Sequence, residues 1–137
     1  MDKVCDQYGN VVQDYTPVSN YHVDISQDTW NNVREGMYRV IKEGSARKVF
    51  TDLNINIAGK TGTAQESKTR GNHAFFISFA PYESPEIAVT VNIPYGYSST
   101  NAAVIAKNIY KYYYNQISLD YILNNSALDV SDVRIGD

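Results

Sequence analysis

The chain has 137 residues, a hydrophobic fraction of 43% and a formal net charge of −3. This length allows one domain at most, and the apolar fraction is enough for a globular core. The negative charge and the absence of a basic cluster argue against a nucleic-acid partner. No apolar run is long enough to span a membrane, and no signal peptide is visible.

The side chains that can bind metals do not have the spacing of a metal site. Cys5, His22 and His73 are the candidates, and no pair among them has ligand spacing. The single cysteine also rules out an internal disulfide. We therefore expect no cofactor and a structural role for all three residues.

The N-terminal segment predicts a small hairpin. Short apolar runs flank Gln7-Tyr8-Gly9, so residues 3–12 are expected to pair as two strands. We expect one partial domain with three parts: a hairpin and connector at 1–25, a helix, strands and a helix at 26–116, and a tail at 117–137.

A helix is predicted from about Gln27 to Glu43. Ser26 can cap its start, and Gly44 marks its end. Its apolar side chains recur on one face: Trp30, Val33, Met37, Val40 and Ile41. Gly36 lies in the middle of the helix, where glycine lowers stability, so we expect close packing against another element there.

Three strands are predicted next, at about 51–64, 73–81 and 86–94. The first begins with the alternating run Leu53–Ile57, which indicates a strand that enters a site. In the third strand, apolar residues alternate with smaller or polar ones, so at least one face is expected to be buried. The apolar set is Ile87, Val89, Val91 and Ile93.

The last predicted helix runs from about Thr100 to Asn115, with Ser99 as its N-cap. Its expected apolar stripe consists of Ala102, Ile105, Ala106, Ile109 and Tyr113. Lys107 and Lys111 lie off this stripe, so we expect them in water. The tail from Ser118 to Asp137 is expected to be lightly packed or partly disordered.

The most specific signal is the pentapeptide Lys60-Thr61-Gly62-Thr63-Ala64. It is preceded by Val33-Arg34-Glu35-Gly36-Met37 and followed by Asn72-His73-Ala74-Phe75-Phe76 and Phe79-Ala80-Pro81. Together these segments resemble the class B, high-molecular-weight penicillin-binding transpeptidases, over about Lys3 to Tyr114. Lys-Thr-Gly is one of three motifs of that superfamily.

The resemblance implies an α+β fold: a three-stranded antiparallel sheet with flanking helices, forming a C-terminal fragment of the penicillin-binding, serine β-lactamase-like transpeptidase fold. It implies that Lys60 and Thr63 are catalytic and that Thr61, Gly62 and Thr63 bind substrate. The lysine would tune the serine nucleophile and attract a substrate carboxylate, which the two threonine hydroxyls would bind. The Thr63 N–H would stabilise the oxyanion, and Gly62 would let an acyl group lie close to the backbone.

The other two family motifs, Ser-x-x-Lys and Ser-x-Asn, have only weak counterparts here. Ser45-Ala46-Arg47-Lys48 matches the first in letters, but it follows a helix end, so a loop serine is the better interpretation. Ser99-Thr100-Asn101 matches the second but comes after the Lys60 strand, the wrong order for the family. We therefore expect a fragment that lacks the nucleophile and is inactive alone.

Four alternatives compete with this interpretation. Gly59-Lys60-Thr61 matches the end of a phosphate loop, but that motif needs glycine where Asn54 stands and a helix directly after the lysine. Lys60 can also be a solvated lysine at a plain hairpin edge. A β-lactam sensor domain of the same superfamily and a non-enzymatic α+β interaction module are the other two.

For the parent enzyme, the resemblance implies peptidoglycan stem peptides and β-lactams as ligands and the remainder of the transpeptidase domain as partner. It also implies a place at the extracytoplasmic face of the bacterial cell membrane, with the anchor outside this chain. If the strands that normally lie beside residues 86–94 are absent, that strand has an open edge. We then expect self-association through it, or coverage by a rearranged segment such as the hairpin at 3–12.

Overall fold

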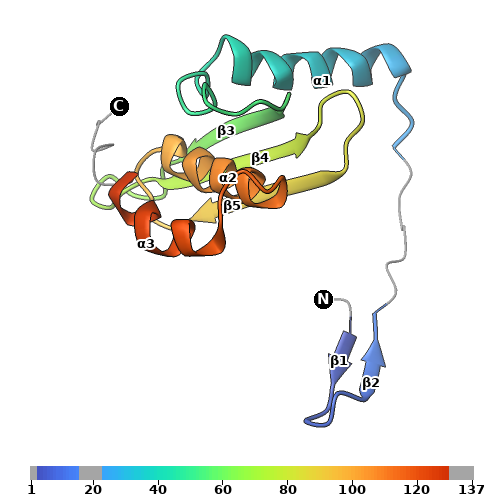
Figure 1. Ribbon diagram of the computed structural model, residues 1–137. Coiled ribbons are helices and arrows are strands. Elements are labelled where there is room, and N and C mark those ends of the chain that lie inside the picture. The colour runs from blue at the N-terminus through green and yellow to red at the C-terminus, as the bar shows by residue number, and fades with distance from the viewer. Residues whose placement is uncertain (1–2, 16–22, 130–137) are drawn as a thin grey trace.

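The computed structural model describes residues 3–15 and 23–129. For residues 125–129 it describes the backbone alone. The main body is a three-stranded antiparallel sheet with helices on both sides, and a separate hairpin precedes it (Figure 1). This α+β architecture confirms the predicted fold class. No helix among the described residues has the length and apolar character needed to cross a membrane.

The sheet consists of β3 (Ala58–Ala64), β4 (His73–Ala80) and β5 (Ile87–Ile93), in the order β3-β4-β5. In the register, Lys60 lies opposite Ile77, and Ile77 lies opposite Thr90. Side chains alternate between the two faces of a strand, so neighbouring residues of β4 point to different layers. Accordingly, Phe76 is fully buried whereas Ile77 is about half exposed.

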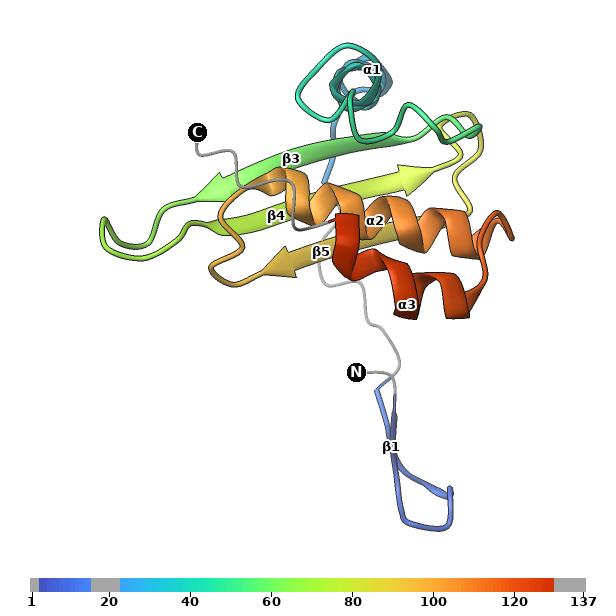
Figure 2. The ribbon, with the colours of Figure 1, turned by 60° about the vertical axis from the view of Figure 1, so that its left-hand side comes forward.

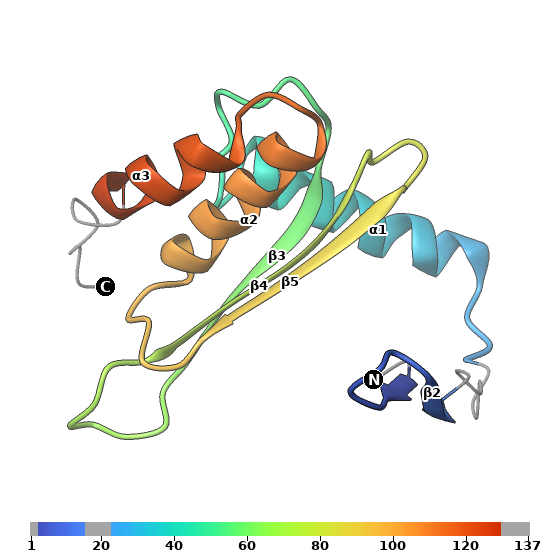
Figure 3. The ribbon, with the colours of Figure 1, turned by 60° about the horizontal axis from the view of Figure 1, so that its bottom comes forward.

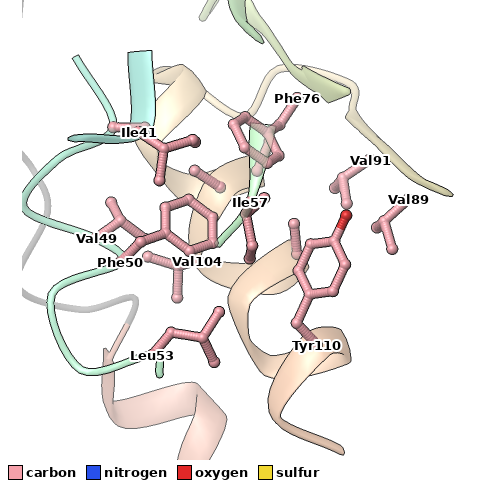
Figure 4. Close-up of a cluster of buried hydrophobic side chains, with 14 of the residues drawn as sticks. Ile41, Val49, Phe50, Leu53, Ile57, Phe76, Val89, Val91, Val104 and Tyr110 are labelled. Atoms are coloured by element: carbon pink, nitrogen blue, oxygen red, sulfur yellow. The ribbon is translucent and has the colours of Figure 1, made fainter. Parts of the chain in front are cut away.

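Helix α2 (Ser99–Tyr113) covers one face of the sheet and closes the main core (Figures 2 and 4). Tyr110 of α2 is fully buried and donates a hydrogen bond from its hydroxyl to Ser78 Oγ of β4 (2.9 Å). The core side chains labelled in Figure 4 come from α1, the loop before β3, the sheet and α2: Ile41, Val49, Phe50, Leu53, Ile57, Phe76, Val89, Val91, Val104 and Tyr110.

Helix α1 (Gln27–Lys42) lies on the other side of the sheet, beside β3 (Figure 3). Arg34 of α1 packs over the Phe79 ring and donates to the Tyr82 carbonyl at 2.6 Å. Glu35 accepts a hydrogen bond from the Tyr82 hydroxyl at 3.2 Å. The Arg39 hydrogen bond lowers the pKa of Glu35, whereas burial, together with the contact to Glu35, raises the pKa of Tyr82. These polar contacts fix α1 to the end of β4.

The predicted face of α1 is only partly covered. Ser26 caps the helix as predicted, by accepting from the Thr29 N–H, and Ile41 is buried in the core. Trp30 and Val33, nearer the start, are about half exposed. The prediction of close packing at Gly36 is wrong for the described residues, because a Cβ built on Gly36 has no atom of another element within 4 Å.

The first strand begins later than predicted. Residues 51–57 form an irregular segment, and β3 starts at Ala58. The Asn56 carbonyl accepts from the Tyr82 N–H at 2.8 Å, in the loop after β4. Leu53 and Ile57 are nevertheless buried, so the apolar alternation reflects a loop that packs into the core rather than a strand.

Helix α2 is present, but its predicted cap and stripe are shifted. Ser98, not Ser99, is the N-cap and accepts from the Thr100 N–H. Ile105, Ile109 and Tyr113 of the predicted stripe are substantially exposed. The residues of α2 that are buried are Ala102, Ala103, Val104, Ala106 and Tyr110. The stripe is rotated because the small alanines let α2 approach the sheet, with Tyr110 reaching Ser78.

The two lysines of α2 do not stand free in water, contrary to expectation. The side chains of Lys107 and Lys111 are only 15% and 17% exposed. Both approach Asp52 of the loop before β3, Lys107 at 3.6 Å and Lys111 in a close hydrogen bond. Partial burial disfavours the ionised Asp52 carboxyl, but the Lys111 hydrogen bond and the two positive charges lower its pKa overall.

The two ends of the described chain also differ from expectation in part. The hairpin is confirmed as β1 (Lys3–Cys5) paired with β2 (Val11–Asp14), a sheet of its own that does not cover β5. The tail contains an unpredicted helix, α3 (Leu119–Asp129), beside α2. Residues 130–137 of the predicted tail, and His22, lie outside the described residues.

Candidate active site

The Lys60–Ala64 pentapeptide forms most of β3, at the edge of the sheet. Among the described residues, β3 is paired with β4 alone, so its other side is an open strand edge. Lys60 and Thr63 are exposed, and Thr61 and Gly62 are partly buried. The structure therefore places all four predicted site residues consecutively on one accessible edge.

The backbone of Thr61 and Thr63 is directed away from β4. Lys60 Nζ donates to the Thr61 carbonyl at 2.6 Å, which requires that carbonyl to face the open side. The N–H and C=O of one strand residue point the same way, and the direction repeats every second residue. The N–H of Thr63 consequently also faces the open edge.

The side chain of Thr61 has a specific partner. Its Oγ1 lies 2.9 Å from Ser45 Oγ, and either hydroxyl can be the donor. Ser45 belongs to the turn that follows α1. Sequence reasoning assigned Ser45 only as a loop serine and missed this contact, because no local pattern links two residues so far apart in the chain.

Two glycines allow β3 and β4 to lie close together. A Cβ on Gly59 would come within 2.6 Å of the buried Phe76 ring and 3.0 Å of the Ile77 carbonyl oxygen. A Cβ on Gly62 would come within 3.3 Å of Phe75 Cβ, a tighter contact than usual. Gly59 is therefore required by packing, whereas a Cβ on Gly62 would face Phe75, on the opposite side of the strand from the Thr61 and Thr63 side chains.

The end of β3 is held by a polar and aromatic network around His73. His73 Nε2 lies 3.2 Å from Glu66 Oε2, and His73 Nδ1 accepts from the Tyr95 N–H at 3.4 Å. The ring also packs against Tyr95, with centroids 4.8 Å apart. Arg70 donates to the Tyr95 hydroxyl at 3.1 Å. These contacts, made by His73 and its neighbours, join the β3–β4 loop to the turn before α2.

The structure gives no support to a phosphate loop at Lys60, to a nucleophile at Ser45 or to a metal site among the described residues. Lys60 lies inside a strand that continues to Ala64, so the helix that a phosphate loop requires is absent. Ser45 lies in a turn and contacts a threonine hydroxyl, not a base. No cluster of three potential metal ligands occurs in the described part of the chain, where Cys5 is a free, exposed thiol.

The Ser99-Thr100-Asn101 segment serves the start of α2. Asn101 Nδ2 donates to the Gly96 carbonyl at 2.8 Å, and the Ser98 hydroxyl caps the helix. Both contacts stabilise the turn between β5 and α2. The contacts found for this segment are thus those of a helix start.

Comparison with known proteins identifies the family of this chain. Residues 6–111 match the penicillin binding protein transpeptidase domain. The peptidoglycan D,D-transpeptidase MrdA of Haemophilus influenzae is 38% identical in an alignment 104 residues long, and the alignment covers 64% of this chain and 16% of that protein. The stage V sporulation protein D of Bacillus subtilis is 35% identical in an alignment 108 residues long, and the alignment covers 72% of this chain and 17% of that protein.

Solved structures agree with this assignment. Pseudomonas aeruginosa PBP2, solved in complex with WCK 5153, has a TM-score of 0.61 and 36% identity over 71% of this chain and 23% of that chain. The D,D-transpeptidase domain of a peptidoglycan glycosyltransferase from Eggerthella lenta has a TM-score of 0.59 and 28% identity over 80% of this chain and 25% of that chain. The chain thus spans about a fifth of the length of the relatives named here. It belongs to the penicillin-binding protein transpeptidase family.

Proposed function

We propose that Lys60, Thr61, Gly62 and Thr63 form one wall of a D,D-transpeptidase site that cross-links peptidoglycan and binds β-lactams. The observation that carries the proposal is the position of the motif on an open strand edge, with the Thr61 and Thr63 backbone directed outwards. The serine nucleophile would come from polypeptide outside these 137 residues, since neither Ser45 nor Ser99 has the surroundings of one.

The chemistry of each proposed role follows from this edge. Acyl transfer passes through a tetrahedral oxyanion, which an outward backbone N–H such as that of Thr63 can stabilise. The Lys60 ammonium is a mobile point charge that can turn from the Thr61 carbonyl towards a serine or a substrate carboxylate. The hydroxyls of Thr61 and Thr63 would donate to that carboxylate, and Gly62, which has no Cβ, would let an acyl chain lie close to the strand backbone.

The full reaction needs an acyl-enzyme intermediate. The serine would attack the D-Ala-D-Ala carbonyl, release the terminal D-alanine, and pass the acyl group to the amine of a second stem peptide. A β-lactam would acylate the same serine. We propose a transpeptidase rather than a sensor domain because the curated relatives named above include D,D-transpeptidases. Its place of action would be the outer face of the bacterial cell membrane, where peptidoglycan is assembled.

Labelling with a fluorescent penicillin tests this proposal in two proteins. The first is the chain alone, for which we expect no covalent adduct, because acylation needs an activated serine. The second is a chimera in which the chain replaces the matching segment of the Haemophilus influenzae relative. In the chimera, mass spectrometry should locate the adduct on the relative's own serine.

Either of two results would contradict the proposal. A stoichiometric adduct on Ser45 of the isolated chain would make Ser45 and Lys48 the catalytic pair. A folded chimera that is never acylated would show that the Lys60 strand cannot complete the site.

A further inference from the structure

We propose that Ser45 is a positioning residue that holds the Thr61 hydroxyl in the orientation needed to bind an anionic substrate group. This inference rests on the proposed function and concerns a residue outside the Lys60–Ala64 motif. It starts from the 2.9 Å contact between Ser45 Oγ and Thr61 Oγ1.

The contact favours one rotamer of Thr61 and allows a proton arrangement that suits an anionic ligand. Threonine is β-branched, so its side chain has few favourable χ1 rotamers, and one hydrogen bond can fix the choice. Each hydroxyl has one proton to donate and can accept as well. When Ser45 donates to Thr61, the Thr61 proton is left free for a carboxylate, which can only accept.

The turn that carries Ser45 is fixed on both sides. Before it, Gly44 N–H donates to the Arg39 carbonyl at 2.9 Å. After it, Ala46 is 1% exposed and its N–H donates to the Val40 carbonyl at 3.2 Å. Burial of the neighbouring backbone leaves little freedom to a residue whose own side chain faces solvent.

Glycine at position 44 makes this path possible. A Cβ there would lie 2.8 Å from Val40 Cα, which would require a shift of the backbone, and 3.0 Å from the Val40 carbonyl oxygen. Farther along, Val49 and Phe50 enter the core, and Phe50 stacks on Phe76 of β4. The turn is thus attached to the same sheet that carries Thr61.

The first test measures the Thr61 rotamer in the 137-residue chain by three-bond NMR couplings. Wild-type Thr61 should show one χ1 rotamer. Ser45→Ala should average the couplings, and Ser45→Thr, which retains a hydroxyl, should restore them. Ser84→Ala, at an exposed serine in the turn before β5, should change nothing. Unchanged Thr61 couplings in a folded Ser45→Ala chain would overturn the proposal.

The second test measures acylation of the chimera by a carboxylate-bearing penicillin. Ser45→Ala should weaken the initial binding constant about tenfold, the scale of one hydrogen bond, and leave the acylation rate constant nearly unchanged. Ser45→Thr should recover binding. In a Thr61→Val background, Ser45→Ala should have no further effect, which keeps the test valid even if one single variant folds poorly.

The outcomes separate this inference from the proposed function. If Lys60→Ala and Thr61→Val leave acylation intact, the proposed function is wrong. If those variants impair acylation but Ser45→Ala does not change binding, only the positioning role of Ser45 is wrong. An additive effect of Ser45→Ala in the Thr61→Val background would also contradict it, because the effect would then not pass through Thr61.

Discussion

At the scale of single residues, the buried hydrogen-bond chain from Tyr110 links three elements. The Tyr110 hydroxyl donates to Ser78 Oγ, and Ser78 donates to the Val89 carbonyl at 3.2 Å, so α2, β4 and β5 are joined inside the core. Burial raises the pKa of Tyr110 to about 12, although the Ser78 hydrogen bond partly opposes that shift. The folded state therefore retains this proton at a pH where an unfolded tyrosine has lost it.

Alkaline pH should consequently destabilise the fold. Below pH 10, tyrosine is neutral in both states and the buried hydroxyl has no linkage effect. Between about pH 10 and 12 the unfolded state loses the proton first, so the free energy of unfolding should fall, by roughly 2–3 kcal/mol from this group. Tyr110→Phe should remove that part of the slope when urea unfolding is measured across this range. An identical slope in both proteins would contradict the assignment.

At the scale of elements, two glycines that look alike in sequence have opposite structural roles. Gly36 lies mid-helix in α1, with nothing within 4 Å of a built Cβ. Gly59 lies in β3 against Phe76, where a Cβ would come within 2.6 Å of the ring. The Phe76 ring is itself fully buried and stacked on Phe50, so it cannot move aside easily.

The two alanine substitutions should therefore change stability in opposite directions. Gly36→Ala should raise the free energy of unfolding by about 0.5–1 kcal/mol, because alanine is the better helix former. Gly59→Ala should lower it by about 1–3 kcal/mol, the usual effect of overpacking a core. Urea denaturation of both variants checks this. Destabilisation by Gly36→Ala would indicate that α1 packs there against something that the described residues do not include.

The elements also show what could be predicted from sequence. The helix periodicity of 27–43, with Ser26 as cap, predicted α1 to within a residue, because caps and apolar spacing are local signals. The apolar alternation from Leu53 to Ile57 predicted a strand that is not there. A loop that packs into the core can bury alternate side chains without forming a strand of the sheet. The buried face of α2 could not be predicted because apolar residues occur on every side of this helix. The face with Tyr110 is buried because the Tyr110 hydroxyl meets Ser78 of β4, a contact that depends on tertiary structure.

The candidate site divides in the same way. The Lys60–Ala64 motif and its place on a strand were predicted from its letters and its flanking segments. The contact between Ser45 and Thr61 was not, because it depends on the path of a turn after α1. Long-range side-chain contacts of this kind follow from tertiary packing and have no local sequence pattern.

At the scale of the whole molecule, the sheet has two edges that are open within the described residues. One is the β3 edge that carries the proposed site, and the other is β5. A Cβ on Gly59 would lie close to the Ile77 carbonyl oxygen, so Ile77 directs its backbone to β3. Because these directions alternate along a strand, the backbone N–H and C=O of Ser78 point to β5 and those of Val89 point to β4. The backbone N–H of Thr90 therefore points to the open side. An unpaired strand edge of this kind favours pairing with another chain.

The isolated chain should therefore self-associate through β5 in a concentration-dependent way. Thr90→Pro removes only an outward N–H, which an edge strand tolerates, so it should shift the chain towards monomer. Val89→Pro, one residue away, removes an N–H directed at β4 and should unfold the sheet instead. Light scattering and circular dichroism measure both effects. A compact wild-type monomer with fast amide exchange throughout 86–94 would show that water tolerates this edge.

The central claim, that the β3 edge is a catalytic wall, is tested most directly by Lys60→Ala in the chimera. The acylation rate by fluorescent penicillin should fall about a hundredfold or more, the scale of losing one preorganised electrostatic group. Urea unfolding should change little, because Lys60 is exposed and its removal leaves no cavity. Lys68→Ala, at an exposed lysine of the β3–β4 loop, is the matched control and should acylate normally. Wild-type acylation by the Lys60→Ala chimera would instead show that Lys60 is a surface residue and that the site assignment is wrong.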